Sequence, residues 1–337
     1  MKTLKTGRFL LLFTVFCCLC GCNYPNDTTS VNEKKYEKNE IKIEKEETAD
    51  VPVIADSNCR IVCFGDSLTE GHGGDGVTMC TTLEELSGHT VLNYGVFAES
   101  LSCIAARQGA NPQYLCEDIV VPADTTPVKA QVEGKYGYEM LLVFGDAGIN
   151  DVILGDIPGT YSIDDEGNRM FTRLTPGEET PLSRGTQLFT HAMLDKKDDD
   201  ILVLWGGSND EPQSVDEIPA MLEKIDEIIA FHGNDKYIIL SLTSRHERIP
   251  VVDEVNNALA EKYSEHYLDL RSYYVNGALD DMGIAPTDMD KEAVEIGDVP
   301  FSLRYNNGED LNHGNSDFYR IAGEKVYDKL KEIGYIN

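Results

Sequence analysis

Five apolar runs along the chain have the length and composition of buried β-strands. They are residues 61–64, 90–96, 200–207, 237–244 and 266–273. Short runs with little polar alternation are typical of parallel strands that are buried on both faces. Amphipathic segments lie between the later runs, for example residues 215–233, which end at a glycine suited to a helix C-cap. With a final helix expected at about 316–333, the pattern predicts an α/β fold with a parallel sheet between helices.

Two segments interrupt this alternation of strands and helices. Residues 111–198 contain short Val, Ile, Tyr and Thr runs separated by Gly, Pro, Asp and Asn, which predicts a small inserted β-rich subdomain. Residues 276–309 are irregular and contain several glycines and aspartates. We expect a long loop there, beside the site.

The N-terminus has the features of an export signal. Lys2, Lys5 and Arg8 precede an apolar run at 9–20, which is too short to span a bilayer as a helix. The run ends in Leu-Cys-Gly-Cys at 19–22, which resembles the lipobox of bacterial lipoproteins. That resemblance implies a signal peptide at 1–21 and lipidation of Cys22, which would anchor the protein at the bacterial cell surface or in the periplasm. A signal peptide without lipidation is the alternative.

The rest of the chain divides into a polar tether and a folded part. Residues 22–55 are rich in Asn, Thr, Lys and Glu with little to bury, which predicts a disordered tether. Residues 56–337 are long enough for one large domain. The formal charge of the 337-residue chain is -30, so neither nucleic acid nor an anionic membrane surface is an expected partner. Contact with a membrane is expected only through the N-terminal lipid, and the sequence leaves the oligomeric state open.

The five cysteines that follow the lipobox do not predict a metal site, because they form no CxxC pair. Five remain after the lipobox, so they cannot all pair with one another. They are Cys59, Cys63, Cys80, Cys103 and Cys116. Cys63 lies in the first apolar run and is expected to be buried, whereas the sequence leaves open a disulfide among the last three.

Polar motifs follow three of the predicted strands and precede the last helix. Gly65-Asp66-Ser67-Leu68 follows the first run, Gly95 ends the second, and Gly207-Ser208-Asn209-Asp210 closes the third. Asp310-Leu311-Asn312-His313, followed by Asn315, precedes the final helix. Since the carboxyl ends of parallel strands meet at one edge of a sheet, the motifs are expected to converge on a ligand site.

Together these motifs resemble those of the SGNH or GDSL hydrolase family, in the family's order. The resemblance implies a flavodoxin-like three-layer sandwich and a catalytic triad of Ser67, His313 and Asp310. It also implies an oxyanion hole formed by the backbone N–H groups of Ser67 and Gly95 and the side-chain amide of Asn209. Neither a metal nor an organic cofactor is implied.

Other polar residues compete for roles at this site. His72 and His246 are alternative bases, but only His313 has an aspartate three residues upstream. Asp66 and Asp210 are expected to bond nearby backbone N–H groups rather than to take part in catalysis. Arg107 either lines the cleft or simply ends a helix.

The sequence therefore predicts a serine esterase that acts on a small ester or an acylated glycan. A short acyl group, most simply acetyl, on an exported carbohydrate or cell-wall polymer fits the expected location. One alternative is a lipase, lysophospholipase or thioesterase of the same family. Another is a non-catalytic lipoprotein that binds glycan or peptide.

Overall fold

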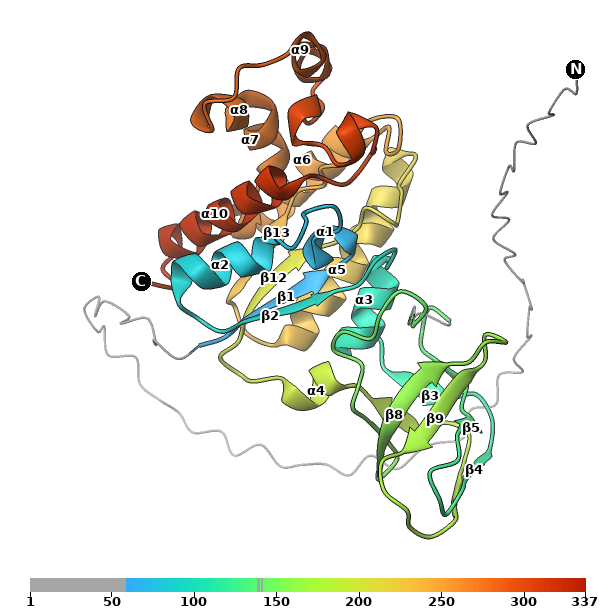
Figure 1. Ribbon diagram of the computed structural model, residues 1–337. Helices are drawn as coiled ribbons and strands as arrows, with labels where there is room; N and C mark the ends of the chain where they lie inside the picture. Colours follow the sequence, from blue (N-terminus) through green and yellow to red (C-terminus); the bar gives the residue numbers. More distant parts are fainter. Residues whose placement is uncertain (1–58, 138–139, 141) are drawn as a thin grey trace, which may run out of the picture. The chain divides into compact units, whose positions relative to one another are not determined.

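A five-stranded parallel sheet forms the centre of the computed structural model, which describes residues 59–137, 140 and 142–337 (Figure 1). In spatial order the strands are β14 (Tyr267–Leu268), β13 (Tyr237–Leu240), β12 (Ile201–Trp205), β1 (Ile61–Gly65) and β2 (Val91–Gly95). Every neighbouring pair is parallel. Each strand overlaps one of the five apolar runs, so the predicted parallel sheet is confirmed.

The carboxyl ends of the three strands that carry motifs lie level with one another. Gly65 of β1 is in register with Gly95 of β2 on one side and with Trp205 of β12 on the other. The residues that follow these strands therefore leave the sheet at the same edge, where ligands bind in open α/β sheets.

Helices follow most of the strands of this sheet. Those of eight or more residues are α2 (Met79–Ser87), α3 (Leu101–Gln108), α5 (Ile218–His232), α6 (Val252–Tyr263), α9 (Asp288–Glu295) and α10 (Ser316–Glu332). The shorter ones are α1 (Ser67–Glu70), α4 (His191–Asp195), α7 (Leu270–Asn276), α8 (Ala278–Asp281) and the 3-10 segments η1 (Val215–Glu217), η2 (Ser264–His266), η3 (Phe301–Leu303) and η4 (Asn306–Gly308). Helix α5 ends at Gly233 in the left-handed conformation, as the sequence predicts.

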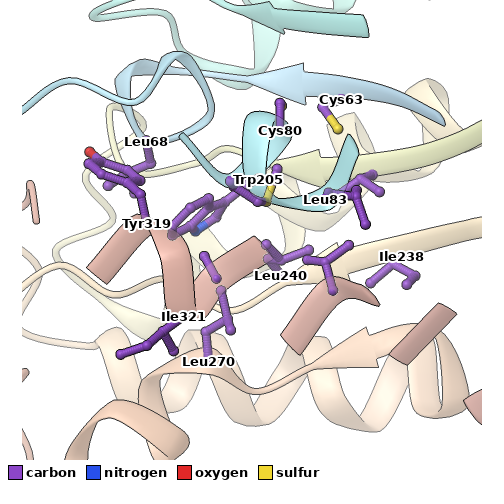
Figure 2. Close-up of a cluster of buried hydrophobic side chains, with 14 of the residues drawn as sticks. Cys63, Leu68, Cys80, Leu83, Trp205, Ile238, Leu240, Leu270, Tyr319 and Ile321 are labelled. Carbon is purple, nitrogen blue, oxygen red and sulfur yellow. The ribbon is translucent and has the colours of Figure 1, made fainter. Parts of the chain in front are cut away.

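Alternate side chains of β1 enter two separate clusters of buried residues. Ile61 and Cys63 pack with residues of α2 and α10, whereas Val62 and Phe64 pack with residues of α3, α5 and α6. The side chains of β12 alternate between the same two clusters, and Figure 2 shows Trp205 in the first of them. Since successive side chains of a strand point to opposite faces, helices contribute to the core on both sides of this sheet.

A second sheet, which is antiparallel, lies between β2 and β12 in the sequence (Figure 1). In spatial order its strands are β5 (Val128–Lys129), β9 (Arg169–Arg173), β8 (Ile157–Ile163), β7 (Val152–Leu154), β11 (Gln187–Phe189), β3 (Gln113–Leu115) and β6 (Val132–Glu133). A separate pair is formed by β4 (Ile119–Val121) and β10 (Thr180–Leu182). These strands fall within the β-rich segment predicted at 111–198, and they bury a hydrophobic cluster of their own.

Two expectations about the later part of the chain were wrong in detail. Residues 276–309 are not one long loop, because they contain α8, α9 and two 3-10 segments. Helix α9 has few apolar residues, but Thr287 and Asp290 form a capping box at its start. The apolar run at 266–273 gives only a two-residue strand, since Asp269 caps α7 and ends the strand.

The cysteines and the N-terminus complete the comparison with the sequence. The five cysteines of the described residues form no disulfide with one another, and Cys63 is buried, as expected. The expected signal peptide, the lipidation at Cys22 and the tether lie outside the described residues. Among residues that the structure describes, no helix is both long enough and apolar enough to cross a membrane.

Candidate active site

Ser67 stands where β1 ends and α1 begins. Gly65 allows this sharp exit, because a Cβ there would lie 2.0 Å from Thr69 Oγ1 and 2.1 Å from the carbonyl oxygen of Trp205. Asp66 is the N-cap of α1, and its Oδ1 accepts a hydrogen bond of 2.9 Å from the N–H of Leu68. As the first residue of the helix, Ser67 has a backbone N–H with no acceptor inside the helix.

Ser67, His313 and Asp310 lie in hydrogen-bonding order. Ser67 Oγ is 2.7 Å from His313 Nε2, and His313 Nδ1 is 3.1 Å from Asp310 Oδ2. The serine and histidine are separated by 246 residues in sequence, yet both are buried. This is the order of contacts that nucleophile, base and orienting acid require.

Several hydrogen bonds hold Asp310 in its charged form. Its Oδ1 accepts bonds of 2.7 Å from the backbone N–H groups of both Asn312 and His313. Burial opposes ionisation, but the bonds from the His313 ring and from these two N–H groups outweigh it, so the pKa of Asp310 lies below its usual value. An ionised Asp310 can keep the His313 ring oriented and stabilise it when it is protonated.

The loop that carries His313 is fixed from both sides. Its carbonyl oxygen accepts a 3.0 Å hydrogen bond from the N–H of Tyr305, and Asn312 Oδ1 accepts one from the hydroxyl of Ser244. Asn315 caps α10 by accepting bonds from two backbone N–H groups. The D-x-x-H-x-N pattern thus places the aspartate, the histidine and a helix start within six residues.

Two of the three expected oxyanion donors already have partners. Asn209 donates from Nδ2 to the carbonyl oxygen of Glu99 at 2.9 Å, which leaves the second hydrogen of that amide. The N–H of Gly95 donates to Asn93 Oδ1, also at 2.9 Å. Gly95 is small for a reason other than substrate access, because a Cβ there would lie 2.0 Å from the backbone nitrogen of Glu70.

Arg248, between β13 and α6, fixes the orientation of the Asn209 amide. Its Nη2 donates to Asn209 Oδ1 at 2.8 Å, and its Nε donates to Glu211 Oε1 at 3.2 Å. Since a guanidinium can only donate, the amide oxygen of Asn209 must face Arg248 and its nitrogen must face away. Arg248 has no motif around it, so reasoning from the sequence missed it.

A buried ion pair lies beneath the ends of β1 and β2. Arg107 and Glu99 are fully buried, with Nε and Nη2 of Arg107 at 3.0 and 2.5 Å from Glu99 Oε2. The same guanidinium donates to the carbonyl oxygens of Gly65 and Tyr94, the residues just before Asp66 and Gly95. The structure thus answers the open question about Arg107, which does not line a cleft but ties the two strand ends together.

His246 and Asp210 are bonded to groups other than the proposed triad. His246 lies between two aspartates, with Nδ1 2.9 Å from Asp298 Oδ1 and Nε2 3.0 Å from Asp253 Oδ2. Asp210 accepts a 2.8 Å bond from the N–H of Leu101, the structural role expected of it.

Burial raises the pKa of Asp66 to about 7, against the effects of the Leu68 N–H bond and of the positive charges of His313 and Arg248. Its Oδ2 is buried and has no hydrogen-bond partner among the described residues.

Aromatic rings surround His313. The His72 ring lies edge-on to it at 4.7 Å between centroids, and the Phe97 ring is stacked on it at 5.8 Å. Tyr305 contacts His72 at 5.5 Å, and Phe144 contacts Phe97 at 5.3 Å. Burial and then the charge of His313 lower the pKa of His72, which favours a neutral neighbour for the base. Phe144 comes from the β-rich segment, so that segment reaches the site.

Among the described residues, no group of three or more His, Cys, Asp or Glu side chains is placed to hold a metal ion. The residues that the site does bring together are acid–base and nucleophilic groups and oriented N–H donors. These groups suit attack on a carbonyl carbon.

Comparisons with known proteins give few matches. No protein-family model matches this sequence, and no curated protein matches it. Two solved structures share 12% sequence identity with this chain. One is a protein assigned to the lipolytic G-D-S-L family, from Desulfitobacterium hafniense DCB-2, with a TM-score of 0.40 over 81% of this chain and 100% of that one. The other is a peptidoglycan O-acetylesterase, with a TM-score of 0.35 over 83% of this chain and 92% of that one.

Proposed function

We propose that this protein is a serine esterase of the SGNH or GDSL type. The observation that carries the proposal is the 2.7 Å contact between Ser67 Oγ and His313 Nε2, with Asp310 on the other ring nitrogen. A serine hydroxyl is a weak nucleophile, and a histidine held in this way can remove its proton during attack. The same proposal describes the fold as a flavodoxin-like three-layer sandwich that carries an inserted β subdomain at 111–198.

The reaction proceeds in two halves. His313 Nε2 accepts the proton of Ser67 as Oγ bonds to the ester carbonyl carbon, and the carbonyl electrons form an oxyanion. When the intermediate collapses, the ester C–O bond breaks and His313 passes the proton to the leaving alcohol. A water molecule then attacks the acyl-enzyme by the same route, which releases the carboxylic acid and restores Ser67.

We assign the oxyanion to the backbone N–H of Ser67 and the remaining amide hydrogen of Asn209. The N–H of Gly95 adds a third donor when Asn93 Oδ1 moves away from it. Removing one such donor typically lowers kcat by a hundredfold or more. Arg248 supports this role, because it determines which end of the Asn209 amide is available.

The preferred substrate in this proposal carries a short acyl group, most simply acetyl, on an exported carbohydrate or cell-wall polymer. The rings of Phe97 and Phe144 support a small acyl group, because they place an apolar boundary beside His313. The export signal and the lipid on Cys22 belong to the same proposal. They would hold the enzyme at the bacterial surface or in the periplasm, where such polymers lie.

Labelling with a fluorophosphonate probe tests the nucleophile directly. The wild-type protein should be labelled at Ser67, and Ser67→Ala should not be labelled. Ser102→Ala is the matched control, because Ser102 is also a buried serine but lies on α3 outside the proposed triad. Failure of the folded wild-type protein to react would count against the esterase proposal and favour a binding role.

A further inference from the structure

A hollow of about 580 Å³ includes Tyr305 in its lining, and the N–H of Tyr305 donates to the carbonyl oxygen of His313. It is called the Asn307 hollow here, and six of its lining residues carry the argument. These are Met289, Phe301, Ser302, Tyr305, Asn306 and Asn307. They come from α9, η3 and η4 and from the junction between the last two. This is the segment that the sequence analysis expected to be a loop.

The lining suits a sugar. Tyr305 is 36% exposed, and an exposed aromatic face can pack against the C–H face of a pyranose. Each carboxamide of Asn306 and Asn307 carries two donors and an acceptor, as hydroxyl groups on a sugar ring require. Pockets that orient small ligands commonly combine apolar walls with a few polar groups in this way.

Local packing holds these groups in place before any ligand arrives. Asn306 and Asn307 both have φ of 52°, a left-handed conformation that asparagine tolerates better than most residues. Gly308 follows with φ of 83°, and a Cβ on it would lie 1.9 Å from the Phe301 ring. Hydrogen bonds from Gly308 N to Tyr305 O and from Glu309 N to Asn306 O close the turn at 3.1 and 3.2 Å. Such strained turns often mark functional positions.

Tyr305 connects the hollow to the base of the triad. Its N–H bonds to the carbonyl oxygen of His313, and its ring contacts that of His72, which contacts His313. The ring also lies on Gly73, where a Cβ would be 2.6 Å from its Cγ atom. The lining of the hollow is therefore in contact, through Tyr305 and His72, with the proposed base.

The charges favour an uncharged ligand. Among the described lining residues, Asp75 and Arg304 are the charged ones, and their formal charges are opposite. The formal charge of the whole chain is -30, which repels polyanions. An acidic polymer would thus meet repulsion at long range and no net positive charge in the hollow.

We propose that the Asn307 hollow binds uncharged sugar units of the polymer whose ester Ser67 attacks. This inference rests on the proposed esterase function and adds the substrate class and its binding site. The sugar would pack against Tyr305 and hydrogen-bond to Asn306 and Asn307, while the acyl group that it carries reaches Ser67.

The test compares two substrates in the full chain. One is p-nitrophenyl acetate, which has no sugar, and the other is O-acetylated xylotetraose, which is uncharged. Tyr305→Ala and Asn307→Ala should each lower kcat/KM for the oligosaccharide by on the order of tenfold more than for the small ester, mainly through KM. Tyr114→Ala is the control, because Tyr114 is similarly exposed at 41% but lies on β3, away from the hollow.

The outcomes separate the two proposals. If the wild-type protein hydrolyses p-nitrophenyl acetate through Ser67 but neither variant changes the ratio between substrates, the esterase stands and the sugar site is overturned. A preference for an acidic O-acetylated peptidoglycan fragment over xylotetraose would overturn the uncharged class. Silence on both substrates, without probe labelling of Ser67, would instead refute the esterase itself. A melting temperature close to that of the wild-type protein would show that a variant is folded.

Discussion

Replacing Arg107 with methionine should destabilise the fold more than most single substitutions. The guanidinium is fully buried, pairs with Glu99, and donates to the carbonyl oxygens of Gly65 and Tyr94. Methionine fills similar volume but leaves a buried carboxylate without its cation and removes the bonds that Arg107 donates to two carbonyl groups. Breaking a buried pair from one side typically costs about 3–5 kcal/mol. For a domain of this size that corresponds to a fall of roughly 5–9 °C in melting temperature.

Urea denaturation of a form of the protein that starts after Cys22 measures this loss in the free energy of unfolding. The double variant Arg107→Met with Glu99→Leu should be more stable than Arg107→Met alone, because it no longer buries an unpaired charge. The activity of Arg107→Met should fall as well. Arg107 holds Glu99 in position, and the carbonyl oxygen of Glu99 accepts the hydrogen bond from Asn209. A loss below about 1 kcal/mol for Arg107→Met would refute the reasoning, because it would mean that the pair contributes no more than an exposed one.

Two further predictions concern individual side chains of the site, and a third concerns the lipobox. Arg248→Gln should lower kcat by roughly tenfold or more with little change in KM, because it frees the Asn209 amide to rotate, and Arg248→Lys should restore part of the loss. Asp66→Asn should gain stability relative to wild type as pH rises from about 4 to 7. Burial raises the pKa of Asp66 to about 7, so in this range the unfolded wild type loses a proton that the folded wild type keeps. An equal difference between the two denaturation profiles at pH 4 and at pH 8 would contradict this. Cys22→Ser should abolish incorporation of labelled fatty acid and release the protein from membranes, whereas unchanged fractionation would count against the lipid anchor.

The parallel sheet could be predicted from the sequence because its strands are short apolar runs. Strands β1 and β12 are buried along their whole length, so they contain no polar residue that would obscure the pattern. Helix α9 was missed because its position depends on a capping box and on Asp290 contacts with Ser302 rather than on an apolar face. Periodicity detects burial, and it cannot detect a helix that is fixed mainly by polar bonds.

The residues of the proposed site were also predictable from the sequence only in part. Asp310 and His313 are three residues apart, so their relation is visible in the sequence, and the structure brings Ser67 to them. By contrast, Arg248 reaches Asn209 only because β12 and β13 are neighbours in the sheet. A long side chain that acts across two loops leaves no local spacing by which to recognise it.

The contacts of Gly95 show that the role of a motif residue can depend on its surroundings in the fold. The family resemblance implies only that the N–H of this glycine binds the oxyanion, whereas in the structure the missing Cβ makes room for Glu70 in α1. Its N–H is also bonded to Asn93 Oδ1. Asn93 therefore becomes a residue to examine, since its replacement by alanine would free that N–H.

The measurement that tests the central claim most directly is p-nitrophenol release by a form of the protein that starts after Cys22. The substrates are p-nitrophenyl esters of increasing chain length, with Ser67→Ala as the blank and Ser102→Ala as the control. We predict turnover that is fastest for the acetyl ester and absent in Ser67→Ala, because the serine hydroxyl is the proposed nucleophile. Equal turnover by Ser67→Ala and wild type would contradict the proposed mechanism.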